Sequence, residues 1–286
     1  MLALVYVKYD RQRGAFAKLL RFLFPCVLKS IKENMAIYEA YMPLPNGTLT
    51  KRCEKKLIAE MKRDKISKFL CTGGCRKLLE DNGFTYAYSE NYLKKNLFKA
   101  IKSLSCELGE NAKKLKICIC EKDKSITASD LLTNCAKSFE NVTLITQDVD
   151  GYSDIQDEIA LQYGAATIVT QSYQPAENAD ILICLSLTDE IFKNARISNH
   201  TVIITVDKDF LPKAYLQSSV ITAFSKPLSS AQAELCKGSI TPWEISCVLD
   251  EQNSDTQENS FTNFYSFGRM VTPKTLLKKN YSDFVI

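Results

Sequence analysis

Between residues 115 and 224, short apolar runs alternate regularly with longer amphipathic stretches. Each run holds five or six residues rich in Ile, Val, Leu and Cys, and the runs are continuously apolar rather than alternating. Continuous apolar runs are typical of strands that are covered by helices on both faces. The six runs lie at 115–120, 142–146, 166–170, 181–185, 202–206 and 220–224.

The stretches between the runs have the spacing of amphipathic helices. Over 127–139 the apolar residues share one helical face, and Thr127 with Asp130 has the spacing of a capping box. Ser153 is positioned to cap the next helix. Alternating strands and helices favour a parallel sheet, and right-handed crossovers make it doubly wound. We therefore predict an α/β fold with a Rossmann-like doubly wound parallel sheet of order 3-2-1-4-5, to which 220–224 adds a sixth strand.

Residues 1–112 have a different pattern, which predicts a smaller basic α/β domain. Apolar runs predict strands at 3–7, 35–41 and 66–71, and helical spacing predicts helices at 50–65, 76–81 and 91–104. The most apolar longer stretch, 15–28, is interrupted by Lys18 and Arg21 and is too short to span a bilayer. It predicts a buried or surface-lying helix.

The end of the chain is polar and then aromatic. Residues 250–260 contain almost no apolar side chain, which predicts a linker. Residues 261–271 are rich in aromatic residues and predict a tail that packs back on the body. In this interpretation the chain divides into domains at 1–112 and 113–249 and a tail at 250–286.

One part of the chain resembles a known family. The stretches NVTLITQD from Asn141, DIQDEIALQYGAATIVT from Asp154 and NADILICLS from Asn178 look like the Rossmann domains of the shikimate dehydrogenase and glutamyl-tRNA reductase type. The similarity covers about 115–206 and is one of pattern. The resemblance implies a Rossmann-like fold, and it implies an NAD(P)-dependent oxidoreductase as an alternative function. It also places Asp148 at the position of a ribose-binding acid.

The turn after the first strand departs from that family. Such families place a glycine-rich turn there, because glycine lets the backbone approach the pyrophosphate at a helix N-terminus. Here the turn runs from Glu121 to Thr127 as EKDKSIT and contains no glycine. Side chains would hold the backbone away from a dinucleotide, and Glu121 and Asp123 would repel phosphate. We therefore expect no useful affinity for NAD(H) or NADP(H) and no bound cofactor.

A smaller ligand remains compatible with this turn. In an open parallel sheet, ligands bind at the carboxyl ends of the strands where the strand order reverses, here between 115–120 and 181–185. The predicted crevice walls are Lys122, Lys124, Ser125 and Thr127 on one side, and Ser186, Thr188 and Asp189 on the other. Cations mixed with hydroxyls favour a small phosphate or another anion. The alternative is a solvated turn that contains an N-cap.

The most distinctive local motif is CTGGC, from Cys71 to Cys75. It follows a predicted strand and opens a predicted helix, so Cys75 is a candidate reactive thiol. A nucleophilic cysteine usually needs a base, and the chain has one histidine, His200, in a polar loop. The motif has no second ligand pair for zinc, so no metal site is predicted. The alternative is a structural turn.

The number of cysteines and the distribution of charge lead to expectations about the compartment and the partners of the protein. The chain has 11 Cys, an odd number at scattered spacing, and no targeting segment, which predicts reduced thiols in a cytoplasmic protein without a membrane partner. Residues 1–112 carry a net charge of +10 and the remainder −6. This asymmetry indicates either an acidic partner or mutual attraction of the two parts. Basic residues do not interleave with aromatic residues in a recognisable motif, which argues against nucleic acid.

No catalytic constellation accompanies these features. A response-regulator receiver is a further α/β alternative because Lys226 precedes Pro227, but Ser186 stands where its phosphoacceptor aspartate belongs. We therefore interpret the chain as a two-domain protein that binds a small ligand or a protein, or acts as a scaffold. The alternatives are an oxidoreductase and a basic N-terminal domain that meets nucleic acid or an acidic partner.

Overall fold

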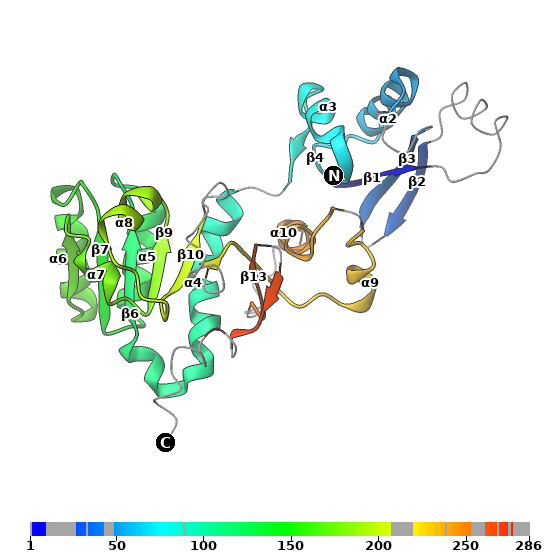
Figure 1. Cartoon of the computed structure of the whole chain (residues 1–286). Helices are drawn as coiled ribbons and strands as arrows, with labels where there is room; N and C mark the ends of the chain where they lie inside the picture. The colour runs from blue at the N-terminus through cyan, green and yellow to red at the C-terminus, as the bar shows by residue number, and fades with distance from the viewer. Residues whose placement is uncertain are drawn as a thin grey trace. The chain divides into compact units, whose positions relative to one another are not determined.

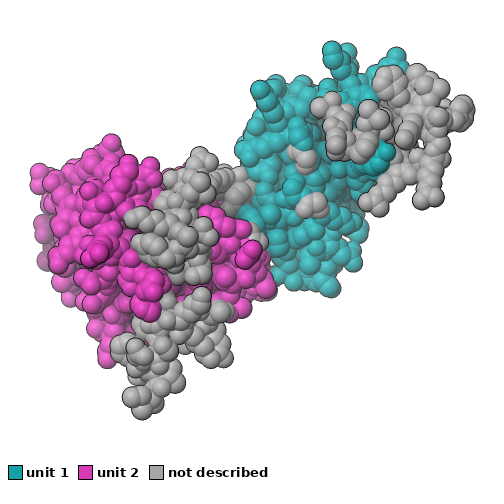
Figure 2. Space-filling model, in the orientation of Figure 1, with its two compact units in different colours: residues 1–89, 228–256 teal, residues 90–227, 257–286 magenta. Residues whose placement is uncertain are grey.

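A computed structural model describes residues 2–9, 27–32, 34–42, 49–87, 90–206, 220–237, 239–252, 261–267, 269–273 and 276. The chain forms two compact units, coloured separately in Figure 2. Unit 1 contains residues 1–89 and 228–256, and unit 2 contains residues 90–227 and 257–286. Each unit is therefore built from two separate segments of the chain.

This division differs from the linear boundaries at 112 and 249. Helix α4 (Glu90–Ser105) packs on α5 (Ile126–Ala136) inside unit 2. Helices α9 (Ser230–Ala233) and α10 (Pro242–Gln252) return to unit 1. There the Tyr86 hydroxyl donates to the Glu244 carboxylate at 2.6 Å. The segments are joined by tertiary contacts between residues far apart in sequence, which local patterns do not report.

Unit 2 is built on a six-stranded parallel sheet, whose strands lie side by side in Figure 1. Read from β8, its order is β8-β7-β6-β9-β10-β11. With the strands numbered along the chain, this order is 3-2-1-4-5-6, which confirms the predicted doubly wound topology. The strands are β6 (Lys116–Cys120), β7 (Asn141–Ile145), β8 (Thr167–Thr170), β9 (Ile181–Cys184), β10 (Val202–Thr205) and β11 (Val220–Ile221).

Helices cover both faces of this sheet. On one face, α5 and α6 (Ser153–Tyr163) pack on β6, β7 and β8, and η2 (Cys106–Lys114) leads into β6. On the other face, α7 (Gln174–Glu177) and α8 (Thr188–Asn194) contribute Ala176 and Ile191 to a core with Cys118, Cys120 and Leu182. Two-sided burial explains the continuously apolar strands, and Cys118 and Cys120 face the same core.

Two predicted helix caps are wrong. Helix α5 begins after Ser125, whose hydroxyl accepts the Ala128 N–H at 3.1 Å, so Thr127 lies inside the helix. Ser125 has the extended backbone of an N-cap, and the earlier hydroxyl therefore takes the position. Ser153 is the first residue of α6, because the 3-10 turn η3 (Asp150–Tyr152) precedes it directly.

The predicted sixth strand divides in two. The parallel strand β11 is only two residues long, and after Thr222 the chain enters β12 (Ala223–Ser225) of a separate antiparallel sheet. That sheet continues through β13 (Asn263–Ser266) and β14 (Arg269–Val271). The aromatic-rich segment after residue 260 is thus part of unit 2.

Unit 1 has a five-stranded mixed sheet of order β2-β3-β1-β4-β5. Only the edge strand β2 is antiparallel to its neighbour. Its elements are β1 (Leu2–Tyr9), β2 (Val27–Lys32), β3 (Met35–Met42), α2 (Lys51–Arg63), β4 (Lys68–Cys71), η1 (Gly73–Cys75), α3 (Arg76–Asp81) and β5 (Thr85–Tyr86). The predicted small α/β domain is confirmed in its fold class.

Two predictions in this part of the chain need correction. Residues 27–28 belong to strand β2, so the helix predicted over 15–28 is wrong at its end, and residues 15–26 lie outside the described residues. Helix α10 continues through Gln252, so the predicted linker does not begin at Asp250, and residues 253–260 lie outside the described residues. Among the residues that are described, no helix is both long and apolar enough to cross a bilayer.

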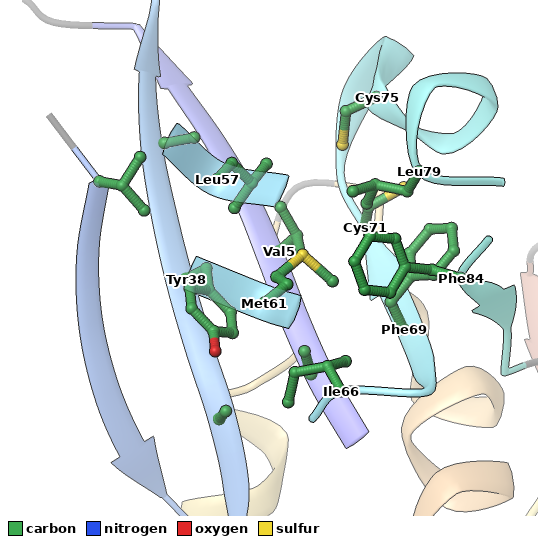
Figure 3. Packing of buried hydrophobic residues seen from close by; sticks show 14 of the residues in the cluster. Val5, Tyr38, Leu57, Met61, Ile66, Phe69, Cys71, Cys75, Leu79 and Phe84 are labelled. Atoms are coloured by element: carbon green, nitrogen blue, oxygen red, sulfur yellow. The ribbon is translucent and has the colours of Figure 1, made fainter. Parts of the chain in front are cut away.

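The core of unit 1 lies between its sheet and its helices (Figure 3). Tyr38, Leu57, Met61 and Phe69 are fully buried there. Phe69 meets the Tyr86 ring edge to face at a centroid distance of 5.5 Å. This core sets the position of the β4–α3 turn, which carries the CTGGC motif.

We expect unit 1 to lose stability in acid. The Asp64 carboxylate pairs with the Lys29 ammonium at 2.8 Å and accepts the Tyr38 hydroxyl, and these hydrogen bonds lower the pKa of Asp64. A carboxyl with a lowered folded-state pKa stabilises the fold above its unfolded-state pKa of about 4 and loses that contribution as the pH falls. Urea midpoints for unit 1 should therefore fall below about pH 4.

Two variants test the cause of that loss. Asp64→Asn should lower the urea midpoint at neutral pH and flatten its acid dependence. Asp81→Asn, at an exposed position at the end of α3, should leave the acid dependence unchanged. If Asp64→Asn retains the full acid dependence, other carboxyl groups cause it.

Candidate functional site

The candidate site lies at the carboxyl ends of β6 and β9, in unit 2. Strand β6 pairs with β7 on one side and with β9 on the other, so the strand order reverses between β6 and β9. The loop after β6 carries Lys122, Lys124 and Ser125, and the loop after β9 carries Ser186. The sheet thus brings the two predicted walls to one edge.

Two backbone amides of the β6–α5 loop donate to hydroxyl groups of the protein. The Lys122 N–H donates to the Ser186 hydroxyl at 2.7 Å, and the Ser125 N–H donates to the Tyr152 hydroxyl at 3.2 Å. Tyr152 is fully buried, and its burial raises the pKa of its hydroxyl. In dinucleotide-binding domains the corresponding amides face the pyrophosphate. Here hydroxyl groups of the protein occupy two of these donors.

A carboxylate joins the two walls of the crevice. Ser186 donates its hydroxyl to Glu121 at 2.6 Å, and Ser125 donates to the same carboxylate at 3.3 Å. The Glu121 carboxylate therefore lies between the two loops, and Lys122 and Lys124 are exposed in the loop after β6.

Asp148 is held toward its own turn. Its Oδ1 accepts the Gly151 N–H at 3.1 Å. A Cβ on Gly151 would lie 2.4 Å from Asp148 Oδ2, so any other residue at position 151 would require the Asp148 carboxylate to move. The Asp148 N–H also donates to Thr146 Oγ1, which donates to the Lys122 carbonyl at 2.9 Å. Asp148 thus belongs to the same hydrogen-bonded network as Lys122.

The remaining predicted residues lie apart from this network. Thr127 is half-buried in the first turn of α5, and Thr188 is 5% exposed at the start of α8. Thr188 therefore packs into the core and contributes little to the wall, because its side chain is almost entirely covered.

Glu190, which α8 places at this edge, was not among the residues that sequence patterns predict for the site. Its carboxylate accepts the Tyr173 hydroxyl at 3.0 Å and the Gln147 amide at 3.3 Å. Burial and the hydrogen bond to Glu190 raise the pKa of the Tyr173 hydroxyl. The three residues come from three separate connections, and no spacing rule relates them.

The backbone is strained beside Ser186. Leu187 has a φ of 59° and is the one residue between Ser186 and α8. This left-handed conformation costs a side chain other than glycine about 1 kcal/mol or more and persists only where surrounding structure holds it. Such strain is concentrated at functional sites.

A second hollow lies at the opposite, amino ends of the strands in unit 2. It has a volume of about 310 Å³, and its lining includes the apolar Cys118 and Ile168 and the charged Lys116 and Glu140. Helix α7 is a single turn, and Ile168 on the edge strand β8 is 59% exposed.

The described residues contain no group of three or more His, Cys, Asp or Glu side chains that could hold a metal ion. His200, an exposed residue of unit 2, donates its backbone N–H to Ser198 Oγ at 3.2 Å in the turn before β10. Cys75 belongs to unit 1. Its thiol donates to the Thr72 carbonyl within its own turn.

No protein-family model matches the chain, and no curated protein matches it. Solved structures with a similar α/β fold include 5-ketofructose reductase of Gluconobacter sp. strain CHM43, at 10% identity and a TM-score of 0.35 over 99% of both chains. Another is a mitochondrial ornithine carbamoyltransferase from Coccidioides immitis, at 11% identity and a TM-score of 0.30, covering 87% of this chain and 82% of that one.

A third similar structure is a putative aspartate carbamoyltransferase from Leishmania major Friedlin, at 10% identity and a TM-score of 0.34, covering 88% of this chain and 83% of that one. Similarities at this level carry no argument. The strand order and the division of the chain show a Rossmann-like parallel α/β unit and a second α/β unit.

Proposed function

We propose that unit 2 is a small-ligand binding module and that its ligand site is the crevice between the carboxyl ends of β6 and β9. The observation that carries this proposal is the left-handed Leu187 at the point where the strand order reverses. Such strain persists only where the surrounding structure holds it, and here it fixes the position of the neighbouring Ser186.

A dinucleotide redox cofactor is not the ligand in this proposal. Two amides that would face its pyrophosphate donate to Ser186 and Tyr152 instead. Asp148, at the ribose-binding position, is turned toward the Gly151 N–H. The resemblance to shikimate dehydrogenase and glutamyl-tRNA reductase domains then describes shared architecture without shared chemistry.

The ligand in this proposal is a small anion, gripped by Lys122 and Lys124. Both ammonium groups are exposed at the mouth of the crevice and are free of the ion pairs described for other lysines. The carboxylates of Glu121 and Asp123 lie in the same loop and oppose a multiply charged ligand. Binding should therefore be weak and should weaken further as salt is added.

The double variant Lys122→Ala with Lys124→Ala is expected to abolish the rise in melting temperature that inorganic phosphate or sulfate causes in the wild type. A ligand that binds the native state raises the melting temperature by mass action. Without anion, the variant should melt close to the wild type, because exposed substitutions move stability by about 0.5 kcal/mol or less.

The matched control is Lys113→Ala with Lys114→Ala, which removes two exposed lysines of η2 and keeps the crevice intact. It should respond to the anion like the wild type. If the crevice variant also responds fully, the crevice is not the site. In a parallel calorimetric titration, NADH and NADPH should give no binding in the low micromolar range, and such binding would contradict the exclusion of dinucleotides.

We also propose a reducing compartment for the protein. Every cysteine among the described residues is a free thiol. Most of them are buried in the two cores, where they pack as small apolar side chains.

A further inference from the structure

The CTGGC motif of unit 1 places two thiols together. Cys71 ends β4, and Cys75 ends η1 just before α3. Cys75 Sγ donates to the Thr72 carbonyl at 3.6 Å, and the Cys71 and Cys75 thiols interact closely enough to shift each other's pKa in opposite directions. Figure 3 shows both side chains at the same edge of the unit 1 core, next to Leu79.

The start of the turn is fixed and its middle is open. The Thr72 N–H donates to the Val5 carbonyl at 2.9 Å, and the Val7 N–H donates to the Thr72 hydroxyl at 2.8 Å. These bonds hold the end of β4 to β1. Gly74 is exposed, and a Cβ there would meet nothing within 4 Å. The turn can therefore adjust around Gly74 while Cys71 stays in place.

From this geometry we propose that Cys71 and Cys75 are a redox-active pair, which a hydroperoxide converts to an intramolecular disulfide. Closing the bond requires the sulfur atoms to approach to about 2.05 Å, with the Cα atoms within about 7 Å. The two residues belong to the one short turn between β4 and α3, and both side chains lie at the same edge of the core. Cys71 and Cys75 are only 6% and 5% exposed, so the oxidant in this proposal must be as small as hydrogen peroxide.

The environment assigns different roles to the two thiols. The hydrogen bond from Cys71 lowers the pKa of Cys75. The same hydrogen bond, together with burial, raises the pKa of Cys71. The thiolate is the attacking form of cysteine, so Cys75 attacks first and Cys71 resolves.

The reaction balances with the hydroperoxide as the oxidant. The Cys75 thiolate attacks one peroxide oxygen, the O–O bond breaks, and the alcohol or water leaves, which makes Cys75 a sulfenic acid. The Cys71 sulfur then attacks Cys75 Sγ, the S–O bond breaks, and water leaves with the thiol proton. Two thiols and one hydroperoxide thus give one disulfide, one alcohol and one water, and the two electrons reduce the O–O bond.

A second group of thiols in unit 2 provides the contrast. Cys118, Cys120 and Cys184 also lie together in one core, but they belong to the regular parallel strands β6 and β9 and are at most 2% exposed. Burial raises the pKa of Cys120. Ladder pairing of both strands prevents the backbone adjustment that a disulfide needs, so this group should stay reduced.

Mass spectrometry of the full-length protein tests the proposal. After hydrogen peroxide treatment, the protein is unfolded in a denaturant, its free thiols are alkylated, and the chain is digested with trypsin. Cys71 and Cys75 share one tryptic peptide, 69–76, and Cys118 with Cys120 shares another, 117–122. Peptide 69–76 should carry no alkyl group and should be lighter than the reduced peptide by two hydrogen atoms. Reduction with dithiothreitol followed by alkylation should give the doubly alkylated peptide.

Peptide 117–122 is the internal control and should remain doubly alkylated at the same peroxide dose. The variant Cys71→Ser should stop at a sulfenic acid on Cys75, which dimedone traps, and Cys75→Ser should give neither the disulfide nor the dimedone adduct. Full alkylation of both cysteines in peptide 69–76 after treatment would overturn the proposal. Equal oxidation of the two peptides would overturn it as well, because the turn would then have no special reactivity.

Discussion

Replacing Phe69 with alanine should lower the free energy of unfolding of unit 1 by about 3–5 kcal/mol. Phe69 is fully buried in the centre of the sheet and packs edge to face on Tyr86. Truncation removes the transfer free energy of the ring and leaves a cavity that surrounding strands fill only in part. A loss of this size is a large fraction of the stability of a typical domain.

Urea unfolding combined with hydrogen exchange measures the effect within unit 1. Exchange protection should fall in β1, β3 and β4, which share the core with Phe69. The matched control is Ile31→Ala on the edge strand β2, because Ile31 is 71% exposed. That substitution should change stability by about 0.5 kcal/mol or less. Equal effects of the two variants would mean that Phe69 is not in the core.

Replacing Phe261 with alanine should destabilise unit 2 by a similar amount, about 3–5 kcal/mol. Phe261 and Phe224 are each 1% exposed and meet edge to face at a centroid distance of 4.8 Å. The Phe261 N–H also donates to Ser103 Oγ of α4 at 3.0 Å. The residue thus joins the antiparallel sheet to the helix that packs on α5.

Hydrogen exchange in β12 and α4 should report this loss, and urea unfolding should show the lower midpoint. Met270→Ala in the neighbouring strand β14 is the control, because Met270 is 62% exposed. This substitution should change the free energy of unfolding by about 0.5 kcal/mol or less, as is usual at exposed positions. If Phe261→Ala is as mild as the control, the segment after residue 260 is an appendage to unit 2 and not part of its core.

The sequence by itself determined the elements of unit 2 and the order of its sheet. The strands β6, β7, β8, β9 and β10 all match apolar runs to within about one residue at each end. Such runs require cover on both faces, and alternation with helices leaves the right-handed crossover as the connection. The reversal between β6 and β9 follows from that topology, and so does the place of the candidate crevice.

The sequence did not determine how the polar groups of that crevice are paired. Ser125 is at once the cap of α5 and a donor to Glu121, and Tyr152 reaches the Ser125 N–H from a different connection. Capping rules relate residues three or four positions apart, whereas Tyr152 is 27 positions from Ser125 and Ser186 is 65 positions from Glu121, so the packing of separate connections decides these pairs. The same limitation hid Glu190 and the strain at Leu187.

Tertiary structure alone decided which segments share a unit. Helix α4 has an ordinary amphipathic pattern, and nothing in that pattern states that its apolar face packs on α5. The burial of Glu244 beside Tyr86 likewise joins α10 to unit 1 across more than half of the chain. Hydrophobic burial is non-directional and proportional to area, so a local pattern shows that a face must be covered but not by which partner.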